Sequence, residues 1–141
     1  MSIVTDIRKG IATNLRTAIT TAQVCDYLIS APTGPTLWVY PDDVDYTESE
    51  GTDYRRFIVE ALAGTSIEEA AQVVLDDFMG NGATSVKKAI ETDKTLGGLA
   101  VVVFVRSCSG YRFVSRAGAE LLAVQWTVDV HASNTDDESE S

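Results

Sequence analysis

The stretch Ser85-Val-Lys-Lys-Ala-Ile-Glu-Thr-Asp-Lys-Thr-Leu-Gly-Gly-Leu99 predicts how a helix and a strand are joined in this chain. Residues 84–92, which include the first part of this stretch, have the apolar spacing of a short amphipathic helix. Gly97 and Gly98 follow, and glycine readily adopts the backbone angles that a reversal of the chain needs. The apolar run Leu99 to Val105 then has the length of a strand. The stretch therefore predicts a helix, a turn capped by glycine, and a strand.

Two longer helices are predicted upstream of this stretch. Residues 3–22 carry one apolar stripe at four-residue spacing, formed by Ile3, Ile7, Ile11, Leu15 and Ile19. Residues 65–79 begin with a capping box, made either by Thr65 with Glu68 or by Ser66 with Glu69. Gly80-Asn81-Gly82 ends that second helix.

Between these helices the pattern predicts two strands separated by an acidic loop. Leu37 to Tyr40 is a short strand that Pro41 closes, and residues 53–63 form the next strand. The loop, residues 41–52, holds five carboxylates: Asp42, Asp43, Asp45, Glu48 and Glu50.

Two further strands are predicted downstream. The run Val-Val-Val-Phe-Val in residues 99–107 suggests burial on both faces and hence a central strand. Residues 107–118 read as a long hairpin connection. In residues 120–132, apolar residues from Leu122 to Val130 alternate with Ala123, Gln125, Thr127, Asp129 and His131, which predicts one dry face and one polar or interfacial face.

The element order α-β-β-α-α-β-β predicts an α+β fold: about four antiparallel or mixed strands with helices packed on one side. Residues 1–131 should form a single domain of the 141-residue chain. Residues 132–141 hold four acids and no base, so they are expected to be a disordered acidic tail. The formal net charge of −10 repels nucleic acid and argues against a DNA-reading role.

Targeting and redox signals are absent from the sequence pattern. The N-terminus lacks the apolar core of a secretion signal, and no apolar run approaches the length of a membrane span. Cys25 and Cys108 are far apart and belong to no CxxC pair, so they are expected to be reduced, intracellular thiols.

Candidate catalytic and ligand sites are weak. His131 is the only histidine and is expected at an exposed strand end; a pair with Cys108 would lack an orienting third group. The acids of residues 41–52 have irregular spacing for calcium, which favours a solvated loop. A phosphate loop follows a strand and opens a helix, and neither glycine pair does so. No catalytic residue, metal site or cofactor is predicted.

Residues 107–118 are the stronger candidate for a functional surface, because arginines and aromatic residues are concentrated there in an acidic protein. Arginine with aromatic side chains is typical of protein contacts and also of grooves for single-stranded nucleic acid, which the overall charge disfavours. The predicted interface residues are Arg106, Tyr111, Arg112, Phe113 and Arg116, with Gln125 and Thr127 from the polar side of the last strand.

Several of these features follow one another as in a known family. Five motifs occur in this order along the chain: the strand Leu37-Trp-Val-Tyr-Pro41, Gly51-Thr-Asp53, Ala71-Gln-Val-Val-Leu-Asp-Asp77, the Asp93-Lys-Thr-Leu-Gly-Gly98 turn and the alternating Leu121–Val130 strand. In this order, over residues 3–131, the chain resembles the tail terminator (tail completion) proteins of long, non-contractile-tailed bacteriophages.

The resemblance implies a structural virion protein and no enzyme activity. Such proteins form a hexameric ring on the head-proximal end of the tail tube, stop its polymerisation and provide the surface for head-neck joining. The implied partners are further copies of the chain, the tail tube protein and a connector or stopper protein. DNA would pass through the lumen without specific binding, and the protein would assemble in the host cytoplasm, with no membrane contact.

Two other classes of protein remain open. One is another neck component, either a head-closure (stopper) protein or a tube protein; tube proteins usually have more strands and long β-hairpins. The other is a small ligand-binding α+β domain or enzyme, which would show a pocket with convergent polar groups.

Overall fold

The computed structural model describes residues 3–20, 22–25, 35–49, 52–65, 69–98, 100–116 and 119–133. They form, in chain order, α1 (Ile3–Ala18), β1 (Gln23–Cys25), β2 (Thr36–Ser49), β3 (Thr52–Thr65), α2 (Glu69–Met79), α3 (Val86–Glu91), a 3₁₀ turn (Leu96–Gly98), β4 (Val102–Arg116) and β5 (Ala119–Ser133).

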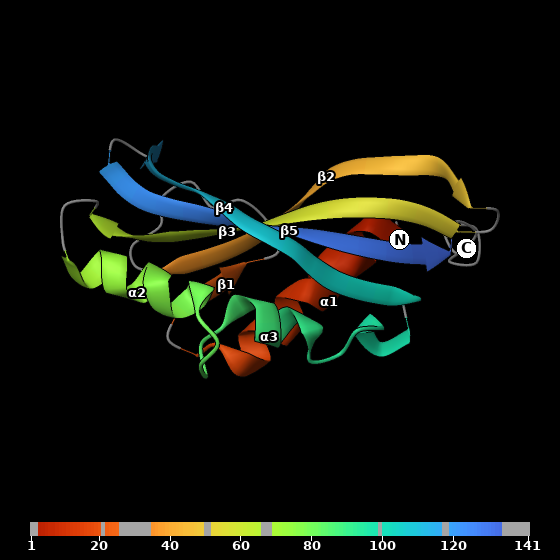
Figure 1. The fold of residues 1–141 in the computed structure, drawn as a ribbon, viewed down its shortest axis with the longest axis horizontal. Helices are drawn as coiled ribbons and strands as arrows, with labels where there is room; N and C mark the ends of the chain where they lie inside the picture. The colour runs from red at the N-terminus through yellow and green to blue at the C-terminus, as the bar shows by residue number, and fades with distance from the viewer. Residues whose placement is uncertain are drawn as a thin grey trace.

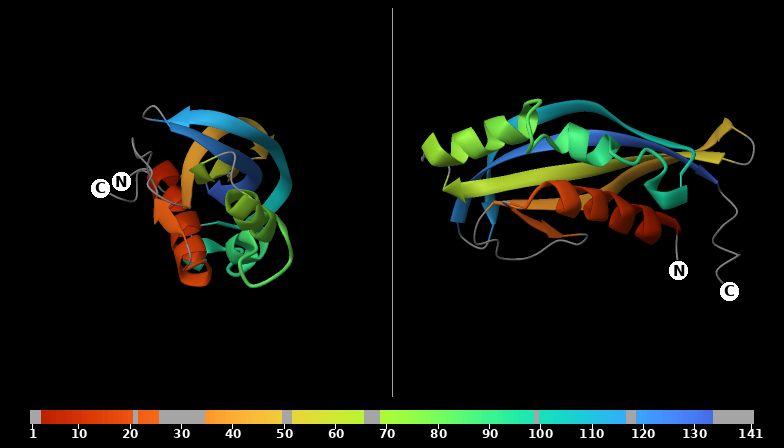
Figure 2. Two further views of the ribbon diagram at one scale, coloured as in Figure 1. Left: turned by 90° about the vertical axis from the view of Figure 1, so that its left-hand side faces the viewer. Right: turned by 90° about the horizontal axis from the view of Figure 1, so that it is seen from below.

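The strands form one mixed sheet in the order β1-β2-β3-β5-β4. Short β1 runs parallel to β2, and the other neighbours are antiparallel. All three helices lie on one side of the sheet (Figures 1 and 2). The predicted α+β class with helices on one side is therefore confirmed, although β1 is a fifth strand that the sequence pattern did not predict.

The face of the sheet that the helices cover, called here the helix-covered face, carries the main core. The predicted stripe of α1, from Ile3 to Ile19, is buried throughout. It packs with Leu75 and Phe78 of α2, with Ile90 of α3 and with alternate residues of the strands. On the sheet these residues are Phe57, Val59, Ala61, Ala63, Leu122, Val124, Trp126, Val128 and Val130. Apolar side chains at helical and strand spacing thus meet in one dry layer.

The predicted acidic loop is part of a long hairpin. β2 continues through Pro41 to Ser49, and β3 starts at Thr52, so only residues 50–51 separate the two strands. Pro41 is tolerated because β1 pairs with β2 only over Thr36 to Trp38, which leaves the outer side of β2 without a described partner at Pro41. The prediction that this strand ends at Pro41 was wrong for that reason.

The predicted hairpin connection at residues 107–118 is also strand. β4 runs to Arg116 and β5 begins at Ala119, so the connection is residues 117–118. The register shifts between Ser109 and Arg112, and Gly110 has a φ of 76°. This glycine bulge lets the strand continue through a segment whose composition is typical of a loop.

β4 is not a central strand, as its apolar run had suggested. It pairs only with β5 in the described sheet, and Val101 just before it is 65% exposed. Val103 alone in the run is fully buried. The last strand, β5, lies between β3 and β4, because the chain order of strands does not determine their order in the sheet.

The turn after α3 has a structural role. Asp93 accepts hydrogen bonds from the backbone N–H groups of Thr95 and Gly97. Gly97 and Gly98 have φ values of 70° and 100°, as a turn of this shape requires, but the residue that caps α3 is Thr92. Leu96 is thereby buried against α1, with its Cβ 3.4 Å from the position that a Cβ on Gly10 would occupy.

The predicted domain boundary at residue 131 lies two residues too early. β5 continues through Ala132, which is fully buried, to Ser133, which pairs with Thr52. The rest of the predicted tail, residues 134–141, lies outside the described residues, as do the predicted capping residues Ser66 and Glu68.

Candidate functional site

The other face of the sheet, called here the second face, carries most of the polar residues of the strands. It is formed by the strand positions that alternate with the core: Tyr54, Arg56, Ile58, Glu60 and Leu62 of β3, and Leu121, Ala123, Gln125, Thr127, Asp129 and His131 of β5. Glu60 and Asp129 are only 2% and 0% exposed, although the described helices pack on the opposite side. Two carboxylates are therefore buried on this face.

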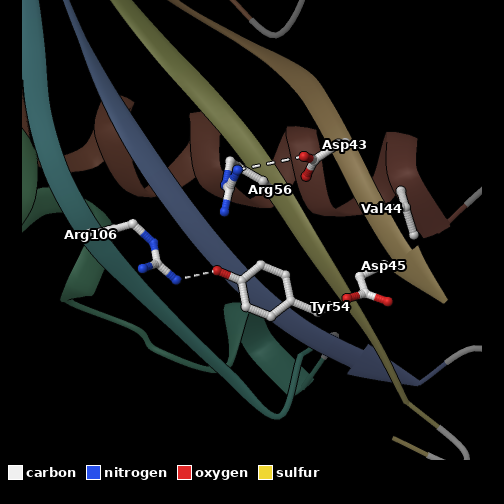
Figure 3. A pocket seen from close by; sticks show the side chains of 6 residues that line it. All are labelled: Asp43, Val44, Asp45, Tyr54, Arg56 and Arg106. Atoms are coloured by element: carbon white, nitrogen blue, oxygen red, sulfur yellow. Dashed lines mark hydrogen bonds and ion pairs between the residues drawn. The ribbon is translucent and has the colours of Figure 1, made fainter. Parts of the chain in front are cut away.

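Arg106 of β4 pairs with one of these two carboxylates, that of Asp129. Its guanidinium forms an ion pair with Asp129 at 2.6 Å and donates a hydrogen bond to the Tyr54 hydroxyl, across β5 (Figure 3). Arg56 lies beside them, 3.7 Å from Asp129 and 3.5 Å from Asp43. Hydrogen bonding to Asp129 and to Tyr54 raises the pKa of Arg106, and hydrogen bonding to Tyr54 raises the pKa of Arg56.

A hollow of about 290 Å³ opens above this network. Asp43, Val44, Asp45, Tyr54, Arg56 and Arg106 line it (Figure 3). With Asp129 beneath, three carboxylates face two guanidinium groups, so the hollow offers no net positive charge to an anion. Its cations are bound to the protein's own carboxylates.

Arg112 of β4 pairs with the other buried carboxylate, that of Glu60. Its guanidinium pairs with Glu60 of β3, again across β5, and Glu60 also accepts a hydrogen bond of 2.8 Å from the Trp38 indole. The Trp38 ring stacks on Tyr40 with 4.5 Å between centroids. Arg106 and Arg112 thus fasten the edge strand to the centre of the sheet, and both are part of the fold.

The predicted interface residues separate onto two faces. Arg106, Arg112, Gln125 and Thr127 belong to the second face, whereas Tyr111 and Phe113 lie on the α2 side of β4. Gln125 and Thr127 are half-buried, and the side chain of Arg116 lies outside the described residues. The arginines and aromatics therefore do not form the single cluster that the sequence suggested.

Tyr111 and Phe113 are the exposed aromatic side chains of that set, at 44% and 61%. With Gln72, Arg112 and Leu122 they line a hollow of about 390 Å³ between β4 and α2. Partial burial raises the pKa of Tyr111, and the negative charge of Asp76 on α2 adds to the effect. Exposed aromatic side chains of this kind are typical of protein contacts.

The candidate catalytic residues do not come together. His131 is half-buried, packing edge-on against Tyr54 at 4.9 Å, so the expected exposed strand end was wrong. Cys108 pairs in register with Trp126, five positions from His131 along β5, and lies on the other face. Burial raises the pKa of the Cys108 thiol. Cys25 lies on β1, at the opposite edge of the sheet from β4.

Neither a metal cluster nor a membrane-spanning helix has a candidate among the described residues. Across the described residues, no three His, Cys, Asp or Glu side chains gather as a metal site would require. No helix in that part of the chain is long and apolar enough to cross a membrane.

Sequence reasoning missed Glu60 and Asp129 as organising residues. The available signal was an acid flanked on both sides by apolar residues, Glu60 in the run Phe57 to Leu62 and Asp129 between Val128 and Val130. Comparison with models of known protein families found no match to this chain, and comparison with curated protein sequences found none either.

Proposed function

We propose that this chain is a structural virion protein, the subunit of a hexameric ring that caps the head-proximal end of a bacteriophage tail tube. The observation that carries the proposal is the order of motifs along residues 3–131, which resembles that of tail terminator proteins. The α+β fold with helices on one side is compatible with it. In this role the protein has no catalytic task.

The surface proposed for contact with a neighbour is centred on Tyr111 and Phe113. The original set also included Arg106 and Arg112, but these arginines hold buried carboxylates of their own chain. Exposed aromatics gain more from burial against a partner than guanidinium groups that are already paired. The proposed partner is the adjacent subunit or the last ring of the tube.

A tube protein is the second candidate, and one observation favours it. The chain has two long antiparallel hairpins, with strands of 14 residues in β2–β3 and 15 residues in β4–β5. Long hairpins are usual in tube proteins, so the three helices alone do not separate the two roles.

Cryo-electron microscopy of intact tails separates these candidates. A terminator should be found as six copies at the head-proximal end only, whereas a tube protein should repeat along the whole tail. A subunit number other than six at that end, or absence of the chain from tails, would contradict the proposal.

The contact surface can be tested in the same system. The double variant Tyr111→Ala/Phe113→Ala should fold normally but yield tails of abnormal length or tails that fail to join heads. Val101→Ala, which alters an equally exposed apolar side chain just before β4, is the matched control and should assemble normally. Normal phage titre from the double variant would show that the two aromatics make no essential contact.

A further inference from the structure

The exposed lysine side chains gather in one part of the molecule. All four lysines of the chain lie on α1, α3 and the turn that follows: Lys9, Lys87, Lys88 and Lys94. All four are exposed, as is Arg16 on α1. Lys87 pairs with Glu91 at 2.8 Å, whereas Lys9, Lys88 and Lys94 form no ion pair among the described residues.

The elements that bear these lysines pack against each other. The Asn14 side chain of α1 donates hydrogen bonds to the backbone carbonyls of Ile90 and Asp93. Leu96 of the turn rests on Gly10 of α1. The four lysines therefore lie on elements that are in contact with one another, and we call the exposed side of α1, α3 and the following turn that bears these lysines the α1–α3 surface. It is basic in a chain whose net charge is −10.

An excess of exposed carboxylates lies elsewhere, on the β2–β3 hairpin. Asp42, Asp43 and Asp45 are all exposed, and the sequence places Glu48 and Glu50 at the end of the same hairpin. Asp43 has Arg56 within 3.5 Å. Arg106 and Arg112 of β4 are bound to Asp129 and Glu60.

The two charged surfaces cannot neutralise each other within one chain. Asp43 and Asp45 line the hollow on the second face, together with Tyr54 and Arg56. α1 and α3 lie on the other side of the sheet (Figures 1 and 2). In a second copy of the chain, however, the α1–α3 surface is free to face this hairpin.

We infer that the acidic β2–β3 hairpin of one copy binds the lysine-bearing α1–α3 surface of the next copy. Because the two patches differ, the contact is head-to-tail, and repeated contacts of this kind close into a ring or extend as a filament. Opposite charges across the contact set its orientation and its salt dependence. The inference deepens the proposed function, since it names the surfaces through which ring subunits join.

Complementary charge reversal tests this contact. One variant, Lys88→Glu/Lys94→Glu, changes the helix surface; another, Asp42→Lys/Asp45→Lys, changes the hairpin. Each purified variant alone should self-associate at least about tenfold more weakly than the wild type, measured by sedimentation velocity at low ionic strength. Mixed in equal amounts, the two variants should associate again, because each altered patch then finds a complementary partner in an alternating ring.

A control of charge uses an exposed acid of α2 other than Asp76, whose charge reaches Tyr111. Asp77→Lys replaces an exposed aspartate by lysine outside both patches, and it should self-associate like the wild type. Circular dichroism of every variant checks that the fold is retained.

Three results would overturn the inference. The wild type could stay monomeric at low salt and high concentration, or the charge-reversal variants could self-associate as strongly as the wild type. The third result is that an equal mixture of the two charge-reversal variants does not associate. Binding of a duplex DNA oligonucleotide by the α1–α3 surface, with no self-association, would instead assign the lysines to nucleic acid. Absence of the chain from tail ends would overturn the proposed function but not this contact, which is measured on purified protein.

Discussion

The two faces of the same sheet differ in what covers their buried side chains. On the helix-covered face, Phe57 and Trp126 pack among aliphatic residues of three helices, and the buried ion pair Arg55–Asp53 lies within β3 itself. On the second face, Glu60 and Asp129 are as deeply buried, but arginines from the edge strand cover them. Apolar burial is non-directional, whereas an ion pair needs its partner at one position.

This difference has a consequence for the edge strand. The register of β4 is specified twice, by apolar contacts such as Val103 below the sheet and by Arg106 and Arg112 above it. Glu91 of α3 adds a third contact, since its carboxylate accepts a hydrogen bond of 2.8 Å from the Val105 backbone N–H. The edge strand is therefore held in place by charge as well as by packing.

The largest effect is expected on the helix-covered face. Phe57→Ala should lower the free energy of unfolding by about 3–5 kcal/mol, because a fully buried aromatic ring leaves a cavity. Urea denaturation followed by circular dichroism measures the change. Val101→Ala, at an exposed site, should change it by less than about 0.5 kcal/mol. A loss below about 1 kcal/mol for Phe57→Ala would mean that this core is loosely packed.

Arg112→Ala tests the second face and should cost about 2 kcal/mol, because it removes the guanidinium that pairs with the buried Glu60 carboxylate. The cost is below that of a fully buried pair, since Arg112 is 37% exposed. In a double-mutant cycle, adding Glu60→Gln should restore part of the loss. Strictly additive effects of the two substitutions would show that the pair does not stabilise the sheet.

The turn that seats Leu96 in the helix layer should be the next most sensitive. Gly97→Ala should cost about 1 kcal/mol, because Gly97 has a φ of 70° and an L-residue is strained there. Gly82→Ala is the control, since Gly82 has an ordinary φ and open space around its Cα. Equal effects in thermal unfolding would contradict a special role for Gly97.

A smaller, pH-dependent effect is expected at Asp93 in the same turn. Hydrogen bonds from the Thr95 side chain and from the backbone N–H groups of Thr95 and Gly97 hold its pKa below the ordinary 3.8. The stabilisation is therefore fully present above 3.8 and is lost as the pH falls through the lowered value. NMR titration should show the lowered pKa, and Asp93→Asn should flatten the acid end of the stability curve. A side chain that titrates at its ordinary value would contradict this.

The smallest effect is expected from removing residues 134–141, which lie outside the described residues. Truncation after Ser133 should change the free energy of unfolding by less than about 0.5 kcal/mol, because residues 134–141 offer no large apolar side chain to a core. Truncation after Val130 is the contrasting variant and should destabilise, since it removes the buried Ala132. A large drop on the shorter truncation would show that the acidic segment contributes to the fold.

Local sequence patterns were sufficient to predict the elements with strong periodicity. Ile3 to Ile19 predicted α1, and the alternation from Leu122 to Val130 predicted β5 with its dry face, because helix and strand geometry place such residues on one side. The turn at Gly97 and Gly98 followed from the backbone freedom of glycine. These are local properties of the chain.

The ends of the strands, the choice of the central strand and the pairing of the charges depend on how distant parts of the chain pack together. Pro41 and Gly110 lie within strands because an outer edge and a bulge tolerate them, which depends on the neighbouring strand. The sequence pattern predicted Arg106 and Arg112 as partner contacts, but the pairing of the strands brings them to Asp129 of β5 and Glu60 of β3. The physical reason is that strand pairing and ion pairing join residues far apart in sequence, and local periodicity carries no information about which of them meet.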